Sequence, residues 1–371
     1  MKFTILVTQD CNLACTYCYV NKHPSVMEIG VAEKVVEFIF ERADANEQNG
    51  IAFFGGEPML ELSLMKKIVD IIEKHPRFHE FMIDFSVVTN GTIFTDEIAA
   101  FLIKHDITYC LSCDGDVDVQ DLHRRFRNGE GSSNVVEATI RRAAADLPIV
   151  LVNAVYSPAT LKSLPNTVRY LMGLGLRQIH VNPDYSASWR SENVETLKSV
   201  YGELADIYMD SYKSGNPVYI NAIDGKIAIL LRGGYQHAER CHMGKKEFAF
   251  SPEGNVFPCE RIIEDGRSDN KHCLGNVDKG IDLSLLTCNM MGTDDVNAEC
   301  LTCGISKYCM NWCGCSNYLS TGYYNRAGAF LCAEQRMLVT TAFHILETLS
   351  KEMPEVFAEH ISGHPMLNSM K

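Results

Sequence analysis

Short apolar runs alternate with amphipathic stretches over roughly the first 213 residues of the chain. The apolar runs have the length of buried strands, and the stretches between them repeat their hydrophobic positions at helical spacing. This pattern predicts strands at residues 3–7, 51–54, 82–88, 108–112, 149–155 and 178–182. It predicts helices at residues 31–43, 62–74, 96–105, 135–145, 161–172 and 195–212.

Six strand–helix repeats in succession favour a parallel sheet with helices on its outer face. Such a sheet is either open or curled into part of a barrel, and we expect a partial (β/α)6 TIM-type barrel. Both arrangements place their chemistry where the carboxyl ends of the strands meet. Candidate functional residues should therefore follow the predicted strands directly.

The strand–helix rhythm stops after a turn cluster at residues 214–217, Ser-Gly-Asn-Pro. We therefore predict one domain over residues 1–215 and a second over residues 216–371. The second domain holds ten of the 15 cysteines and ends in an apolar helical stretch around residues 333–349. Because a small domain with little core and many thiols is usually held together by metal, we expect metal centres there.

Composition excludes several classes of protein. The chain has 371 residues, 46% of them hydrophobic, but no run near the roughly 20 apolar residues that cross a bilayer. A formal charge of −13 has the wrong sign for attraction to phosphate backbones. The first residues show no secretory signal, so we expect a cytoplasmic protein that binds neither membrane nor nucleic acid. In that compartment, clustered cysteines indicate metal or cluster ligands rather than disulfides.

Three cysteines lie within eight residues just after the first predicted strand. They are Cys11, Cys15 and Cys18, and no further cysteine follows until Cys110. Ferredoxins wrap [4Fe–4S] clusters with similar spacings, but a nearby fourth cysteine completes their ligand run. Three thiolates on a four-iron cluster leave one iron open to a small molecule. The alternative is a zinc site, which prefers thiol pairs or Cys/His sets that close a tetrahedron.

With Tyr17 before its last cysteine, this motif resembles that of the radical S-adenosylmethionine (radical SAM) superfamily. The resemblance implies that the open iron binds the amino and carboxylate groups of SAM. It also implies that an electron from the cluster cleaves SAM to a 5′-deoxyadenosyl radical, which abstracts hydrogen from the substrate. The protein's part is to hold cofactor and substrate in register.

The second predicted strand ends in Gly55-Gly56-Glu57-Pro58, which resembles the superfamily's GGEP motif. The resemblance implies that the backbone and the Glu57 side chain meet the SAM ammonium. Glycine suits such a place, because a side chain would block the approach of backbone to ligand. Without the cysteine motif before it, this sequence would be an ordinary turn.

Further matches follow the next strands. Asn90 lies in a TNG segment and Ser112 in an LSxDG segment, and the resemblance implies that Ser112 contacts SAM. His123 and Arg127 match a further pattern in which the arginine reaches the SAM carboxylate, as a bidentate guanidinium can. The alternatives are turn capping for Asn90 and Ser112 and a solvated surface charge for Arg127. For Asn153, His180 and Pro183 at later strand ends, core or turn roles are favoured over an adenosine pocket.

Seven C-terminal cysteines have the spacing of a SPASM domain, which in the radical SAM superfamily holds two auxiliary [4Fe–4S] clusters. The resemblance implies that the distal cluster is held by Cys300, Cys303, Cys309 and Cys332. It assigns the nearer cluster to Cys241, Cys259 and Cys313.

The nearer cluster lacks a fourth ligand, because Tyr235 stands where some members of the family have a cysteine. It either keeps an open iron or recruits Cys273, Cys288 or Cys315. The alternative for each of these three is an ordinary buried or surface thiol. Cys110 and Cys113, near the end of the fourth strand, are interpreted as packing residues.

Glu260 directly follows Cys259. In the anaerobic sulfatase-maturing branch an aspartate stands there and serves as the base that deprotonates the substrate. A glutamate offers the same carboxylate one methylene further out. The alternative is an ion pair with the adjacent Arg261.

Together these motifs imply a radical SAM enzyme with three [4Fe–4S] clusters and SAM as cofactors. We expect it to crosslink or oxidise a side chain of a ribosomally made peptide or protein, with a low-potential electron donor such as flavodoxin or ferredoxin. The alternative is an anaerobic sulfatase-maturing enzyme that forms formylglycine from Ser or Cys. An iron–sulfur electron carrier and a zinc-stabilised binding module are contenders from other classes.

Overall fold

The computed structural model describes residues 1–236, 241, 243–282, 284–285 and 298–363. The chain forms two compact units. The first unit comprises Met1–Ser112, Asp121–Val150 and His242–Met291, and the second comprises Cys113–Gln120, Leu151–Cys241 and Gly292–Lys371. Each unit thus combines segments from both sides of residue 215.

The first unit is built on parallel strands that follow one another along the chain. In order they are β1 (Lys2–Thr8), β2 (Gln48–Gly55), β3 (Met82–Thr89) and β4 (Ile107–Ser112). Ile5 pairs with Phe53, and Ile51 pairs with Phe85, which sets the register. All residues of β1 after Lys2 are buried, as expected for a strand covered on both faces.

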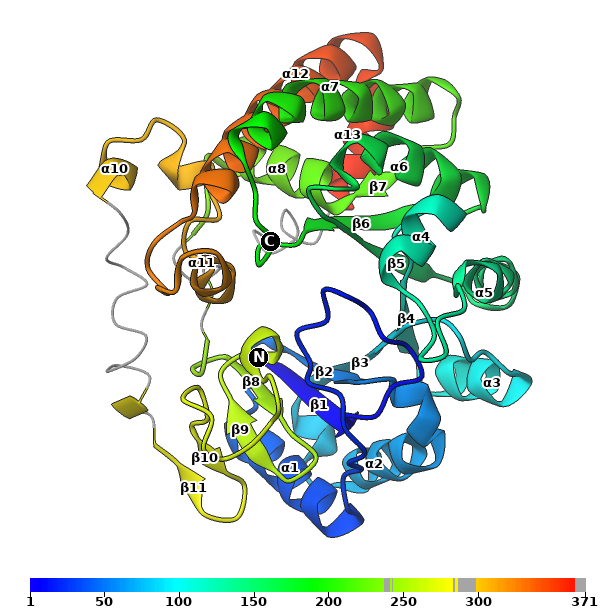
Figure 1. Cartoon of the computed structure of the whole chain (residues 1–371), viewed down its shortest axis with the longest axis vertical. Coiled ribbons are helices and arrows are strands. Elements are labelled where there is room, and N and C mark those ends of the chain that lie inside the picture. The colour runs from blue at the N-terminus through cyan, green and yellow to red at the C-terminus, as the bar shows by residue number, and fades with distance from the viewer. Residues whose placement is uncertain (237–240, 242, 283, 286–297, 364–371) are drawn as a thin grey trace. The chain divides into compact units, whose positions relative to one another are not determined.

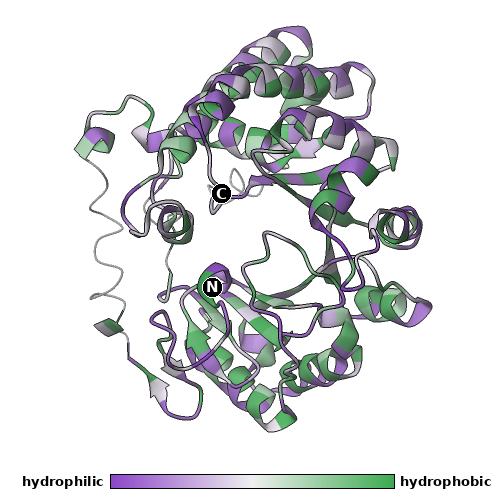
Figure 2. Ribbon diagram, viewed as in Figure 1, coloured by the Kyte–Doolittle hydropathy of each residue, from purple (hydrophilic) through white to green (hydrophobic). Residues whose placement is uncertain are grey.

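Helices of the first unit are amphipathic and pack on the sheet. They are α1 (Ile29–Arg42), α2 (Leu62–Lys74), α3 (Asp96–Lys104) and α5 (Ser133–Asp146), with short 3-10 turns η1 (Pro58–Glu61) and η2 (Phe78–Glu80). The Thr95 side chain caps α3 by accepting from the Ile98 N–H at 3.2 Å. In Figure 2 these helices are hydrophobic on one side and hydrophilic on the other.

A second edge of this sheet comes from late in the chain. Strand β8 (Glu247–Phe250) pairs parallel with β1, and β9 (Asn255–Phe257) returns antiparallel to β8 (Figure 1). The edge continues with β10 (Gly275–Asn276) and β11 (Gly280–Ile281), and η5 (Glu260–Ile262) follows β9. Phe38 of α1 packs edge-on against Phe248 and Phe250 of β8.

The second unit contains three more parallel strands, β5 (Val150–Tyr156), β6 (Gln178–Pro183) and β7 (Tyr219–Ile220). Its helices include α6 (Leu164–Gly173), α7 (Ser191–Lys213), α8 (Asn221–Arg232), α11 (Gly314–Thr321), α12 (Ala329–Glu352) and α13 (Pro354–Ser362). Shorter elements are η3 (Leu161–Ser163), α10 (Ala298–Leu301) and η6 (Ser306–Tyr308), while α4 (Val117–His123) lies where the chain passes between the units. Helix α12 packs along α7 and α8.

The α/β fold class with a parallel-rich sheet is confirmed, and every predicted strand and helix is present with ends shifted by a few residues. Two features differ from the expectation. Strand β7 and helix α8 continue the strand–helix alternation past residue 215. The β8–β9 hairpin, which also lies beyond residue 215, extends the sheet of β1. Within the described residues, helices that combine the length and the hydropathy of a membrane span are absent.

Candidate functional site

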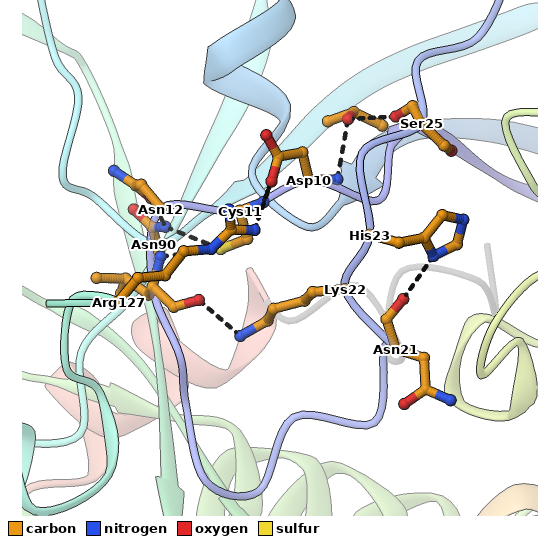
Figure 3. Close-up of polar contacts among 11 residues, drawn as sticks. Asp10, Cys11, Asn12, Asn21, Lys22, His23, Ser25, Asn90 and Arg127 are labelled. Carbon is orange, nitrogen blue, oxygen red and sulfur yellow. Dashed lines mark hydrogen bonds and ion pairs between the residues drawn. The ribbon is translucent and has the colours of Figure 1, made fainter. Parts of the chain in front are cut away.

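The loop after β1 carries the three clustered cysteines. Cys11 is buried, Cys15 partly buried and Cys18 exposed. The Cys11 N–H donates to the Asp10 carboxylate at 2.9 Å, and the Leu13 N–H donates to Cys11 Sγ at 3.4 Å. Lys22 Nζ donates to the Leu13 carbonyl at 3.0 Å and so joins the two arms of the loop (Figure 3). Three thiols on one tethered loop form a donor set that fits an iron–sulfur cluster.

Asn90 connects the end of β3 to this loop. Its Nδ2 lies 3.6 Å from Cys11 Sγ and 2.8 Å from Asn12 Oδ1 (Figure 3). Its Oδ1 accepts from the N–H and the hydroxyl of Thr92 at 2.9 and 2.6 Å. The side chain is therefore fixed from both ends. Asn90 therefore both caps the turn at Thr92 and contacts the cysteine loop.

Glu57 lies beneath this contact and is fully buried. Its carboxylate accepts from the Met59 N–H (2.9 Å), the Thr89 hydroxyl (2.7 Å) and the Asn90 N–H (2.7 Å). Burial raises the pKa of Glu57, although these three donors oppose the rise. The contact predicted between Glu57 and the SAM ammonium remains a prediction. In the structure the carboxylate fixes the position of Asn90, and Pro58, also buried, starts η1 beside it.

Gly55 and Gly56 are required by a close approach of two backbone segments. A Cβ on Gly55 would lie 2.1 Å from the Thr8 carbonyl oxygen, and one on Gly56 would lie 2.0 Å from the Asp10 carbonyl oxygen. The N–H groups of Gly56 and Glu57 donate to these same two carbonyls. The glycines therefore serve the join between β2 and the cysteine loop directly.

The segment 123–127 runs along the other side of the cysteine loop. The Ala14 N–H donates to the Arg125 carbonyl at 2.7 Å, and Thr16 Oγ1 lies 2.7 Å from His123 Nδ1. The Tyr17 ring packs edge-on against His123, with the Arg124 guanidinium over its face. The HxxxR motif thus holds the loop in place.

Arg127, at the end of this segment, forms an ion pair with Asp10, and its side chain is 51% exposed. Its N–H also donates to the Asn12 carbonyl at 3.3 Å. Ser112 ends β4 and is nearly buried. The SAM contacts predicted for these two residues remain predictions.

Both ends of the cysteine loop, at Gln9 and Asn21, contact the segment that follows β9. The Glu264 carbonyl accepts from the Asn21 N–H at 3.0 Å and from Gln9 Nε2 at 3.2 Å. Tyr19 stacks on Phe54, and both rings pack against a buried cluster that includes Val20 and Cys273. Cys273 donates to the Gly275 carbonyl at 3.2 Å, as a packing residue would.

Glu260 lies in a partly buried charged group of the first unit. Lys2 Nζ is 3.0 Å from Glu260 and 2.8 Å from Glu247, so the described ion pair of Glu260 is with Lys2. Burial alone would raise the pKa of Glu260, but the Lys2 ammonium outweighs it and lowers the pKa. Burial and the Glu260 charge raise the pKa of Glu247. Tyr19 lies close enough to Glu260 to experience its charge.

In the second unit, three of the four thiols predicted for the distal cluster interact with one guanidinium, and the fourth, Cys300, interacts with Cys309. Arg336 Nη2 donates to Cys303 Sγ at 3.3 Å and also hydrogen-bonds Cys332. Cys309 interacts electrostatically with Cys300, Cys332 and the Lys226 ammonium. Four thiols around two cations form a donor set suited to an anionic cluster.

The three thiols predicted for the nearer cluster lie in different units. Cys313 hydrogen-bonds both Cys241 and Cys315 in the second unit, and the Cys313–Cys315 Sγ distance is 3.7 Å. Cys259 is buried in the first unit, and Cys288 lies outside the described residues. Cys110 and Cys113 are both buried, consistent with packing.

Sequence reasoning missed a buried carboxylate on α12. Glu334 accepts hydrogen bonds from the hydroxyls of Tyr156 (2.7 Å), Tyr185 (2.9 Å) and Tyr201 (3.2 Å). Burial raises its pKa against these three donors. The sequence motifs also gave no role to Lys2, Glu247 or Arg336. For Arg336 a signal existed, because a residue four positions after Cys332 on a helix lies on the same face.

Residues 5–171 match the radical SAM superfamily. A cysteine-type anaerobic sulfatase-maturating enzyme of Clostridium perfringens is 24% identical over 82% of this chain and 86% of its own length. Among solved structures, anSMEcpe with bound AdoMet has a TM-score of 0.80 and 21% identity, covering 98% of both chains. SuiB of Streptococcus suis bound to precursor peptide SuiA has a TM-score of 0.61 and 14% identity, covering 89% of this chain and 75% of SuiB.

The cysteine loop and this match define residues 5–171 as a radical SAM domain. The chain therefore contains a radical SAM domain, and over most of its length it is similar to the anaerobic sulfatase-maturating enzymes.

Proposed function

We propose that this protein cleaves SAM at a [4Fe–4S] cluster and modifies a side chain of a peptide or protein. The observation that carries the proposal is the three-cysteine loop fixed by Asn90 and Glu57 at the ends of three neighbouring strands. When bound, the cluster supplies the electron that cleaves SAM, and the 5′-deoxyadenosyl radical abstracts a hydrogen atom from the substrate.

The residues of the loop have distinct roles in this proposal. Cys11, Cys15 and Cys18 would hold the cluster and would keep one iron open for SAM. Asn90 orients Cys11 through its Nδ2. Arg127 offers a half-exposed guanidinium whose shape suits the SAM carboxylate. Gly55 and Gly56 keep the backbone beside the loop free of side chains.

The C-terminal cysteines extend the proposal to two auxiliary clusters in a SPASM domain. The grouping of Cys300, Cys303, Cys309 and Cys332 near Arg336 supports the distal one. We assign both clusters the role of accepting the second electron of a substrate oxidation, with flavodoxin or ferredoxin as the donor to the first cluster.

A peptide or protein substrate is supported by the solved relatives. One structure of anSMEcpe, covering 95% of this chain, contains AdoMet and the Cp18Cys peptide, and SuiB is bound to its precursor peptide. We propose crosslinking or oxidation of such a peptide as the leading reaction. Formylglycine formation is the second candidate, because the sulfatase-maturating relatives span most of this chain. Glu260 is the candidate base for either reaction.

The test is anaerobic incubation of the reconstituted full chain with SAM, dithionite and peptides, followed by mass spectrometry. One peptide carries a sulfatase-type Cys or Ser, and another carries several cysteines. Release of 5′-deoxyadenosine with an aldehyde on the first peptide supports formylglycine formation, and a crosslink in the second supports the leading reaction. An electron carrier or a zinc protein would release no 5′-deoxyadenosine, and that result would overturn the proposal.

A further inference from the structure

Three thiols of the second unit meet at the start of α11. Cys313 is the residue that precedes the helix, and Cys315 lies in its first turn. Cys313 Sγ is 3.7 Å from Cys315 Sγ and 3.3 Å from Ser316 Oγ, and it also hydrogen-bonds Cys241. The cysteine motif assigns two of these thiols to the nearer auxiliary cluster. It assigns no role to Cys315.

The environment of Cys315 differs from that of the other described candidate, Cys273. Both thiols are buried. Cys273 belongs to an apolar cluster and donates to a carbonyl at 3.2 Å, whereas Cys315 faces another thiol. A buried thiol that contacts Cys313, which in turn hydrogen-bonds Cys241, is placed as a ligand would be.

The chain around these thiols is firmly built. Asn317 Nδ2 donates to the carbonyls of Asn311 (2.7 Å) and Tyr324 (3.0 Å), which pins the first turn of α11 to the segments before and after it. The N-terminus of a helix also favours negative charge, and thiolates and their clusters are anionic. The position is thus both fixed and electrostatically suited to thiolate ligands.

Position 235, where some relatives have a cysteine, is used here for packing. The Tyr235 ring meets Trp312 edge-on with centroids 5.1 Å apart, and Lys226 Nζ lies 5.2 Å from the centre of the same ring. Its N–H donates to the Lys307 carbonyl at 2.8 Å. A fourth cysteine ligand of the nearer cluster must therefore stand at another position in the chain.

We propose that Cys315 is a thiolate ligand of the nearer auxiliary cluster, alongside Cys241 and Cys313 of the same unit. This inference rests on the proposed function, because it requires the auxiliary clusters. Cys315 would then supply the ligand that is missing at position 235, and that coordination position would be closed to a substrate thiolate.

The test uses the full-length chain with Cys11, Cys15 and Cys18 all changed to Ala, so that only auxiliary clusters form. In this background, about eight irons per chain are expected after anaerobic reconstitution. Cys315→Ala should lower the count toward four or convert one cluster to a three-iron form detected by EPR. Cys315→Ser, which keeps the side-chain volume, should alter the EPR signal of the same cluster. Cys273→Ala is the matched control and should keep all eight.

The outcomes distinguish a failure of the proposed function from a failure of the Cys315 assignment. If the background protein fails to hold about eight irons, the auxiliary clusters of the proposed function are wrong. If it holds them and both Cys315 variants keep the same iron count and EPR spectrum, the assignment of Cys315 is overturned. Iron loss in Cys288→Ala instead would give the ligand role to Cys288. The four irons of the distal cluster, retained in the Cys315 variants, show that the second unit has folded.

Discussion

The side-chain amide of Asn90 lies 3.6 Å from the sulfur of Cys11, while the Asn90 N–H is held by the buried carboxylate of Glu57. Three consecutive parallel strands therefore end in one hydrogen-bonded unit. β1 contributes the cysteine loop, β2 contributes Glu57 and β3 contributes Asn90. This arrangement makes the geometry of the first thiol depend on groups that are far away in sequence.

Asn90→Asp should weaken the site more than Asn90→Ala. The aspartate keeps the acceptor for Thr92 but replaces the Nδ2 donor with an oxygen, which places negative charge beside a thiolate. We expect the reconstituted variant to lose its first cluster to an iron chelator several times faster than the wild type. The rate of bleaching under anaerobic conditions measures this. Equal rates in all three proteins would contradict the role of Asn90.

Glu57→Gln should destabilise the first unit by about 1–3 kcal/mol. A glutamine accepts through one oxygen only, so its amide group faces a backbone or hydroxyl donor that has lost its acceptor. Denaturant unfolding of the variant and the wild type measures the difference. The matched control is Glu33→Gln on the exposed face of α1, which should change stability by less than about 0.5 kcal/mol.

Tyr185→Phe should cost about 1.5–3 kcal/mol, because it removes one of the tyrosine hydrogen bonds to the buried carboxylate of Glu334. Tyr201→Phe should cost at least as much, because the Tyr201 hydroxyl bonds both Glu334 (3.2 Å) and the Tyr156 hydroxyl (2.9 Å). Thermal or denaturant unfolding of the two variants gives the order. Tyr323→Phe, where the ring is half exposed, is the control and should be close to neutral. A neutral Tyr185→Phe would show that the network adds no stability.

The hydrophobic pattern sufficed for the strands and helices of the first 213 residues, because each is long and periodic. It missed β7, which has only two residues and no alternation to detect. The motifs located the cysteine loop and its neighbouring strand ends. They missed the partners that tertiary structure supplies, such as Lys2 for Glu260 and three tyrosines for Glu334. Pairings between residues more than 100 positions apart leave no local signal.

Acid should destabilise the protein partly through His180. Burial lowers the pKa of His180 to about 4, against about 6.5 in an unfolded chain. Between these values the unfolded state binds more protons, so stability is complete above about pH 6.5 and is lost as the pH falls toward about 4. His180→Gln removes this contribution. The stability difference between about pH 7 and about pH 5 should be smaller in the variant by on the order of 1 kcal/mol. An unchanged difference would show that groups other than His180 cause the loss of stability in acid.

The central claim is that radical chemistry starts at the cysteine loop after β1. The most direct measurement compares the full chain with the variant in which Cys11, Cys15 and Cys18 are all Ala. Both proteins are reconstituted anaerobically, their iron is counted, and release of 5′-deoxyadenosine from SAM is assayed under reducing conditions. We expect about twelve irons in the wild type and about eight in the variant, with 5′-deoxyadenosine formed only by the wild type. Continued SAM cleavage by the variant would contradict the account.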